Sequence, residues 1–358
     1  MQQEAAIGLL LNSEPQPFRK FETVPQPKTV RRAPRRFPRS GPWALAPWTL
    51  PPTVGPYLAK SLENRWRYYK EQLRRCQRSF SEQTVHEFRV ATRRLIAQLV
   101  MIECVAPRET VHRARRLLKR RLKALGELRD THVQLLFIER RLQRYPELML
   151  VRDFLRRKER RLEKSAAARM KAFKTRKLAK WIPAVVEHLT PDIRVEANVY
   201  LESGVARARR LEKLARALAR ATTRAFGEVV FRRRSINPAV AGTVHRTRTA
   251  FKKFRYMMEA LSPAYTNLNK RDLRALAQYQ RRMGTLQDLE VIQQCLEAFT
   301  NRNDGMDELL EQFARYLLAR RAQALRSFLK TADELFNFWP PSRAKTNGHV
   351  AAHALDAA

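Results

Sequence analysis

A short basic phrase is written twice in this chain, and the repetition constrains the fold more than any other feature of the sequence. Val85–Leu95 (VHEFRVATRRL) recurs 159 residues later as Val244–Phe254 (VHRTRTAFKKF). On an α-helix, the histidine, the arginine three positions on and the cation seven positions on share one narrow stripe, with the cation at the eighth position beside it. Neighbouring like charges destabilise their own helix. Two such stripes therefore indicate a partner outside the helix, most simply a polyanion.

Further matches in the same order indicate that a larger region is duplicated. Five positions after the first phrase recur at an offset of 158 after the second, namely Arg116, Lys123, Gly126, Leu128 and Asp130 as Arg274, Arg281, Gly284, Leu286 and Asp288. The two cations of each set stand seven residues apart and share a helix face. Each half is thus expected to hold a His-led basic helix, a second basic helix, and a Gly-x-Leu-x-Asp turn into another helix. We expect each aspartate to cap that helix and pair with nearby arginine, in preference to a catalytic role.

The overall charge is strongly positive. The 358 residues include 72 lysines and arginines against 34 aspartates and glutamates, which gives a formal net charge of +38, and 44% of the residues are hydrophobic. The hydrophobic content is normal for a globular protein, so we expect the chain to fold and to carry the charge on its surface. Its length allows two domains or two pseudo-repeats. Such an excess attracts anions: nucleic acid, an acidic lipid surface or an inorganic polyanion.

The central part of the chain has an almost wholly helical pattern. Apolar residues recur at helical spacing, glycine is scarce, and no alternating strand pattern persists. Helix breaks are expected near Pro107, Gly126, Tyr145-Pro146, Pro183, Pro191, Asn237-Pro238, Pro263 and Gly284. They leave four to five helices in each half. We therefore predict an all-α fold of two pseudo-symmetric four-helix bundles that arose by internal duplication.

Composition divides the chain into four parts. Residues 1–55 are rich in proline and arginine and are predicted to form a disordered basic arm, which either adds nonspecific affinity for polyanions or is simply a soluble tail. Residues 56–190 and 191–338 are the two helical halves, and residues 339–358 are a disordered tail. No segment approaches the roughly 20 apolar residues of a membrane span. Three cysteines without paired spacing indicate a reducing, cytoplasmic compartment.

The sequence lacks the motifs of several common catalytic sites. It contains neither a phosphate-binding Gly-x4-Gly-Lys-Ser/Thr loop nor a Gly-x-Gly-x-x-Gly turn, and neither a His-Glu-x-x-His pair nor a cysteine cluster for zinc. The carboxylates form no obvious magnesium set, and Gly-x-Ser-x-Gly is missing. We therefore expect no cofactor, no metal and no enzymatic activity.

The histidines that head the two stripes, His86 and His245, are candidates for anion contact, although a lone helical histidine is more often structural. Their neighbouring cations favour neutral imidazole until an anion arrives, after which charge-assisted donors can converge on it. A helix rises about 10 Å from His86 to Arg93, at 1.5 Å per residue. That length suits consecutive groups of a linear polyphosphate better than one small anion.

The paired His-x-x-Arg-x-x-x-Arg/Lys-Arg/Lys phrases, each followed by a Leu-x-Asp turn, resemble those of the CHAD family, the conserved histidine α-helical domain. The resemblance covers roughly residues 56–337. It implies two pseudo-symmetric four-helix bundles whose basic helices line a central channel for inorganic polyphosphate, in proteins often found with polyphosphate granules. Some members are fused to a CYTH triphosphatase, but its Glu-x-Glu-x-Lys signature is not found in this chain, so that activity is not implied.

Position by position, the resemblance implies polyphosphate-contacting side chains in both halves. They are His86, Arg89, Arg93, Arg94, Arg116, Lys123, His245, Arg248, Lys252, Lys253, Arg255, Arg274 and Arg281. Of these, Arg116, Lys123, Arg274 and Arg281 are flanking contributors. Where the second half has Arg255, the first half has Ile96, so the first half either grips the ligand less tightly or turns this position to the core.

The leading interpretation is a non-enzymatic, cytoplasmic polyphosphate-binding protein, associated with polyphosphate granules or polyphosphate metabolism. A nucleic-acid-binding or nucleoid-binding helical protein is the first alternative, because the net charge and the basic arm would also attract nucleic acid nonspecifically. A polyphosphate-processing enzyme is the second. The sequence leaves the oligomeric state and the preferred chain length open.

Recognition by the basic stripes and recognition by net charge predict different effects of mutation. If the stripes carry recognition, replacing Arg89 and Arg248 with alanine weakens polyphosphate binding far more than replacing Arg35 and Arg36. If the two histidines contact phosphate, binding also tightens as the pH falls through the histidine range.

Overall fold

The computed structural model describes residues 54–189, 204–238, 240–262 and 268–339, and this part of the chain is all-helical. Its elements are α2 (Val54–Arg78), α3 (Glu82–Ile102), α4 (Arg108–Ala124), α5 (Gly126–Glu139), α6 (Leu148–Lys171), α7 (Arg176–Glu187), α8 (Gly204–Arg234), α9 (Ala241–Leu261), α10 (Lys270–Thr300), α11 (Met306–Thr331) and the short 3-10 helix η2 (Ala332–Asn337). The predicted all-α class is confirmed. Most of the predicted arm and tail, and the breaks expected at Pro191 and Pro263, lie outside the described residues.

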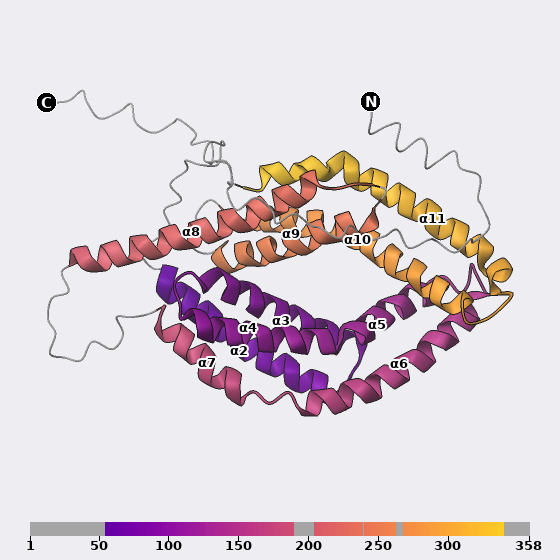
Figure 1. Ribbon diagram of the computed structural model, residues 1–358, viewed down its shortest axis with the longest axis horizontal. Coiled ribbons are helices and arrows are strands. Elements are labelled where there is room, and N and C mark those ends of the chain that lie inside the picture. Colours follow the sequence, from indigo (N-terminus) through magenta and orange to yellow (C-terminus); the bar gives the residue numbers. More distant parts are fainter. Residues whose placement is uncertain (1–53, 190–203, 239, 263–267, 340–358) are drawn as a thin grey trace, which may run out of the picture.

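The two halves of the chain lie alongside each other (Figure 1). Helices α2 to α7, drawn in indigo to magenta, form one side, and α8 to α11, drawn toward yellow, form the other. Helix α3 packs against α9, and α5 packs against α10 farther along the molecule. The two helices that carry the repeated phrase, α3 and α9, are therefore neighbours across the line where the halves meet.

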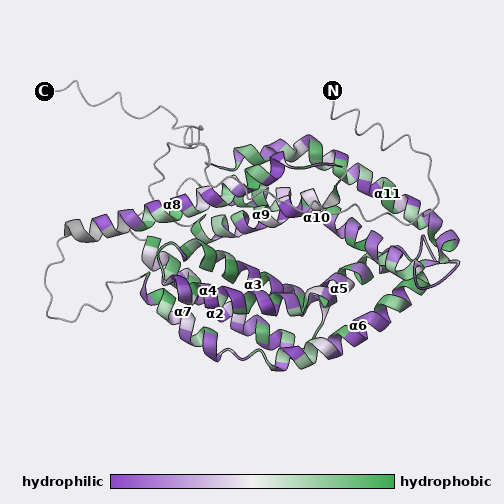
Figure 2. Ribbon diagram, viewed as in Figure 1, coloured by the Kyte–Doolittle hydropathy of each residue, from purple (hydrophilic) through white to green (hydrophobic). Residues whose placement is uncertain are grey.

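Two clusters of buried apolar side chains hold the helices together. The larger one draws on both halves, with Phe88 of α3 and Phe251 of α9 fully buried in it. The smaller one joins α5 and α6 to α10 and α11, and buries Leu155 and Phe313. Burying a side chain of this size contributes about 1.5–3 kcal/mol. Hydrophobic and hydrophilic residues are interleaved along the helices (Figure 2), as expected where one face meets the core and the other meets water.

Two of the expected helix breaks are wrong. Gly284 lies inside α10, and Pro183 lies inside α7. A single glycine costs a helix only about 1 kcal/mol relative to alanine, which the packing of α10 against α9 and α5 outweighs. Proline costs about 3 kcal/mol in a helix interior, but Ile182 and Val185 on either side are buried and keep α7 in place.

Among the described residues, the first half has more α-helices than the expected four to five, whereas the second half has four, as expected. Leu125 separates α4 from α5 in the first half, whereas α10 runs unbroken across the matching position. The described residues therefore contain six α-helices in the first half and four in the second. Among these helices, none is both long enough and apolar enough to cross a membrane.

Candidate functional site

The packing of α3 and α9 determines which way the side chains of the two basic phrases point. Helix α3 begins where the Ser81 hydroxyl accepts a hydrogen bond from the Thr84 backbone N–H at 3.3 Å, which satisfies a donor that has no partner within the helix. Phe88 and Leu95 of α3 are fully buried, as is Phe251 of α9. Because these side chains anchor one face of each helix, they determine where the cations on the other faces point.

Four cations of the two phrases, which we call the cation cluster, come together between α3 and α9: Arg89, Arg93, Arg248 and Lys252. The pKa of Lys252 is lowered to about 6, first by burial and then by the charges of Arg93, Arg248 and Arg89. Arg89 and Arg93 belong to the first half of the chain and Arg248 to the second, so both basic rows face the same space. Within the described part of the chain, no carboxylate lies within ion-pair distance of these four side chains.

The arginines of the cation cluster are buried or partly buried, and no described carboxylate lies within ion-pair distance of them. Burial lowers the pKa of Arg89 to about 10, and it also lowers the pKa values of Arg93 and Arg248. Nη1 of Arg89 donates to the Leu122 carbonyl oxygen at 2.6 Å. The Nε atoms of Arg89 and Arg248 are buried and have no hydrogen-bond partner. Buried donors without partners are unfavourable, and an anion that entered the cluster would satisfy them.

Asp130 and Asp288 face the cation cluster from α5 and α10. Burial raises the pKa of Asp130, against the opposing charge of Arg89, and it raises the pKa of Asp288, against the opposing charge of Arg248. The predicted capping role is wrong, because α5 is preceded by Leu125 and Asp288 lies in the interior of α10. The two carboxylates offset part of the positive charge and would repel phosphate groups placed beside them, so they restrict the path that a polyanion can take.

The two histidines have different surroundings. His86 is exposed, and its pKa is lowered by partial burial and then by the charge of Arg129. His245 is also exposed, and its Nδ1 forms a hydrogen bond with Oε1 of Gln287. Arg129 and Gln287 occupy matching positions, each directly before the aspartate of the repeated pattern. Both imidazoles are accessible to an anion, one beside a cation and the other oriented by an amide.

The carboxylate of Glu259 forms ion pairs with both Arg94 and Arg255. Nε of Arg94 lies 3.4 Å from Oε2 of Glu259, and Nη2 of Arg255 lies 3.4 Å from Oε1 of the same residue. Because Arg94 is on α3 and Glu259 is on α9, this ion pair links the two motif helices. Ile96, which matches Arg255, packs against the larger core. The first half therefore turns this position toward apolar neighbours, one of the two expectations for it.

Lys253 does not join the cation cluster. Its pKa is lowered by burial and then by the charge of Arg115, with Lys119 adding to the effect, and both of these residues lie on α4. Lys252 and Lys253 are adjacent in the chain, but successive residues of a helix are turned by about 100°. One lysine therefore faces α3 and the other faces α4.

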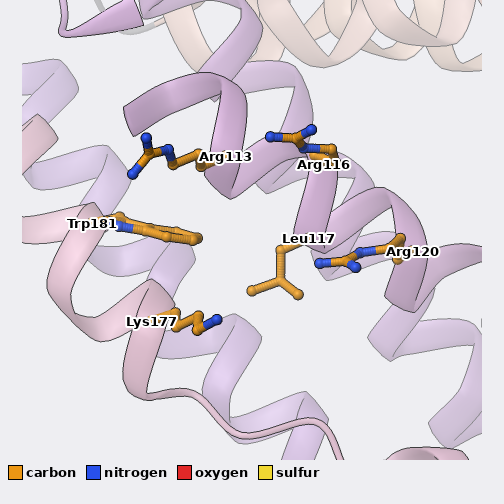
Figure 3. Close-up of a pocket in the computed structure, with 6 residues that line it drawn as sticks. All are labelled: Arg113, Arg116, Leu117, Arg120, Lys177 and Trp181. Carbon is orange, nitrogen blue, oxygen red and sulfur yellow. The ribbon is translucent and has the colours of Figure 1, made fainter. Parts of the chain in front are cut away.

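Arg116 lines a separate pocket between α4 and α7 (Figure 3). This pocket has a volume of about 240 Å³ and is lined by Arg113, Arg116, Leu117, Arg120, Lys177 and Trp181. In Figure 3 the three arginines project from α4 and Trp181 reaches toward them from α7. No residue of the cation cluster lines this pocket. The remaining flanking cations, Lys123, Arg274 and Arg281, are exposed on α4 and α10.

Arg129 and Tyr256 belong to the site, although the sequence patterns did not single them out. Arg129 forms an ion pair with Glu82, and its charge lowers the pKa values of His86 and Arg93. Tyr256 has the opposite effect on Arg93. The position of Arg129 inside the repeated turn was an available signal, but the second half has glutamine there. Tyr256 gave no signal, because it follows the basic phrase and resembles an ordinary core aromatic.

The comparisons with known proteins agree with this architecture. The family model for the CHAD domain matches residues 57–297, and the chain belongs to this family. The fold is similar to the crystal structure of the CHAD domain from the plant Ricinus communis, with a TM-score of 0.56 and 21% sequence identity. That match covers 77% of this chain and 91% of the plant domain. No curated protein matches the sequence.

Proposed function

We propose that the protein binds inorganic polyphosphate along the cation cluster. The observation that carries the proposal is Lys252, whose pKa is lowered to about 6 by burial and by arginines from both halves of the chain. A protein that keeps four cations together with no carboxylate within ion-pair distance is less stable for doing so, and a bound polyanion reduces that penalty. The CHAD family, to which the chain belongs, is known to bind polyphosphate-related substrates, which supports the same ligand.

The chemistry of the cluster suits a chain of phosphates. Arg89, Arg93 and Arg248 offer planar guanidinium groups that can donate two hydrogen bonds to neighbouring phosphate oxygens. Lys252 adds a compact charge that forms when phosphate arrives. The exposed imidazoles of His86 and His245 extend the donors beyond the buried cations. A linear ligand can contact these groups one after another, whereas a single small anion reaches few of them.

Binding of this kind is multivalent and electrostatic. A polyanion releases its condensed counterions as lysine and arginine replace them, so the affinity falls steeply with salt. We expect the same protein to bind nucleic acid nonspecifically and more weakly, because a duplex presents its phosphates on a stiff, wide surface. Association with polyphosphate granules in the cytoplasm follows from the proposed ligand.

Parallel titrations with long-chain polyphosphate, duplex DNA and ATP, at two salt concentrations, test the proposal. We expect polyphosphate to bind most tightly and to displace DNA at both salt concentrations, because its flexible chain can follow the cation cluster. ATP should bind weakly, since its three phosphates occupy only part of the row. Failure of long-chain polyphosphate to displace the duplex would favour a nucleic-acid-binding protein instead.

We further propose that the protein binds polyphosphate without processing it. The described groups that face the cluster are mostly cations, which can hold anions, and the two aspartates offset only part of this positive charge. Incubation of the protein with polyphosphate and Mg²⁺ should therefore leave the chain length unchanged, as judged on a gel. Shortened chains, or phosphate on His86 or His245, would show that the site is catalytic.

A further inference from the structure

A second group of polar side chains lies between α5 and α6, outside the cation cluster. It consists of His132 on α5 and Glu159 and Glu163 on α6, whose potential ligand atoms all lie within 4.8 Å of one another. The two glutamates are four residues apart and so share one face of α6. That face packs against α5.

His132 is buried without a hydrogen bond. Its side chain is 2% exposed, and neither ring nitrogen has a hydrogen-bond partner. Nε2 lies 3.4 Å from Oε1 of Glu159, which directs the ring toward the two carboxylates. A neutral imidazole keeps a lone pair for a ligand. A buried ring with two unsatisfied nitrogens indicates a missing partner.

The matching positions in the other half hold an ion pair. Helices α6 and α11 begin at Leu148 and Met306, which keeps the offset of 158. His132 and Glu163 then correspond to Glu290 and Arg321. In the second half these two form an ion pair, with Nε of Arg321 3.2 Å from Oε2 of Glu290. The first half therefore has a histidine where the second half has the carboxylate, and a carboxylate where the second half has the cation, so this ion pair has no counterpart there.

The glutamates of the first half retain free acceptor atoms. Arg156 binds Oε2 of Glu159 at 2.8 Å and leaves Oε1, the oxygen that faces His132. Glu163 has no ion pair within the described residues, and the charge of Arg156 acts on it only from beyond ion-pair distance. A positive ion between the two carboxylates and the imidazole would give Glu163 a close cation and His132 a partner.

We propose that His132, Glu159 and Glu163 bind a divalent transition-metal ion, with one imidazole nitrogen and two carboxylate oxygens as protein ligands. Imidazole favours zinc and its first-row neighbours over magnesium and calcium, and carboxylates complete such sites. The ion would join α5 to α6 near the smaller core. This site shares no residue with the cation cluster, so the metal-binding proposal can be tested separately from polyphosphate binding.

Titration of the chelator-treated, full-length protein with Co²⁺ and Zn²⁺ tests the site. We expect one equivalent of Co²⁺ to give a saturable visible absorption band and Zn²⁺ to displace it, with a rise in melting temperature on metal binding. Glu163→Gln keeps the shape of the side chain and removes one ligand charge, so the affinity should fall at least about tenfold. Glu290→Gln, the matched change in the other half, should bind metal like the wild type.

Two results would contradict the proposed metal site. One is wild-type protein that binds no stoichiometric Co²⁺. The other is Glu163→Gln and His132→Gln variants that bind Co²⁺ with wild-type affinity. Circular dichroism of each variant shows whether it is folded. If His132→Gln is unfolded, the isosteric Glu163→Gln alone decides the outcome.

Discussion

Lys252 has a strongly lowered pKa in the folded protein. An unperturbed lysine has a pKa near 10.4, whereas burial and neighbouring arginines lower that of Lys252 to about 6. Between these two values the folded protein binds fewer protons at this residue than the unfolded chain does. The contribution of Lys252 to stability therefore increases as the pH rises across this window, and it is least favourable below the folded pKa.

Polyphosphate binding at neutral pH should therefore take up protons. Phosphate beside Lys252 favours its charged form, so we expect an uptake approaching one proton from this residue, with a smaller part from His86, and an affinity that increases as the pH falls toward 6. Calorimetric titration in buffers of different ionisation enthalpy measures the uptake. In Lys252→Arg the side chain is always charged, so the uptake should fall by nearly one proton. Equal uptake by the variant and the wild type would mean that Lys252 is not at the binding site.

Residue spacing indicated which of these cations lie together, and their role in binding stays a prediction. The third and seventh positions after each histidine were expected on one stripe, and these are the four residues that form the cation cluster. The eighth position was expected to lie beside the stripe, and it does diverge: Arg94 meets Glu259, and Lys253 faces α4. Helix geometry gives the angle between neighbouring residues, but only the packed structure shows which partner each one meets.

At the scale of helices, Glu259 should stabilise the contact between α3 and α9 and have little part in binding. Replacing it with glutamine releases Arg94 and Arg255 from a partly buried ion pair, which should lower the free energy of unfolding by about 1 kcal/mol. Polyphosphate affinity should stay the same or rise, because two cations become free. Chemical denaturation and a binding titration measure the two effects.

The matched control is Glu311→Gln on α11, which breaks an exposed pair with Arg315. This change should alter stability by less than about 0.5 kcal/mol. An equal loss of stability in both variants would show that Glu259 contributes no more to stability than an exposed ion pair. A large loss of polyphosphate affinity in Glu259→Gln would place that carboxylate in the binding machinery instead.

The course of the helices was only partly predictable. The breaks at Pro107, at Tyr145-Pro146 and near Asn237 agree with the structure. Gly284 does not break α10, because its place is decided by tertiary packing against Arg248 and the helices around it, and an added Cβ would lie 3.7 Å from Nη2 of Arg248. Glycine marks a break only where no such packing holds the helix, and sequence alone does not contain that information.

At the scale of the whole molecule, the repeated sequence pattern is compatible with a cation cluster that draws on both halves. Matching helices of the two halves, α3 with α9 and α5 with α10, pack against each other. Cations that match in sequence therefore meet in space. The repeated phrase predicted two basic rows, and only the resemblance to the CHAD family implied that they line a common channel. The group of His132, Glu159 and Glu163 was not predicted, because its members lie on two helices without a recognisable spacing.

The central claim is that cations from both halves form one polyphosphate site. Its most direct test is the affinity of the double variant Arg93→Ala/Arg248→Ala for long-chain polyphosphate, compared with Arg35→Ala/Arg36→Ala, which loses the same charge from the N-terminal arm. Arg89 is left intact because it donates to the Leu122 carbonyl. If each contact contributes about 1.5 kcal/mol, the cluster variant binds roughly 100-fold more weakly while the arm variant changes by less than about threefold. Equal losses in the two variants would contradict the claim and show that net charge alone attracts the polyanion.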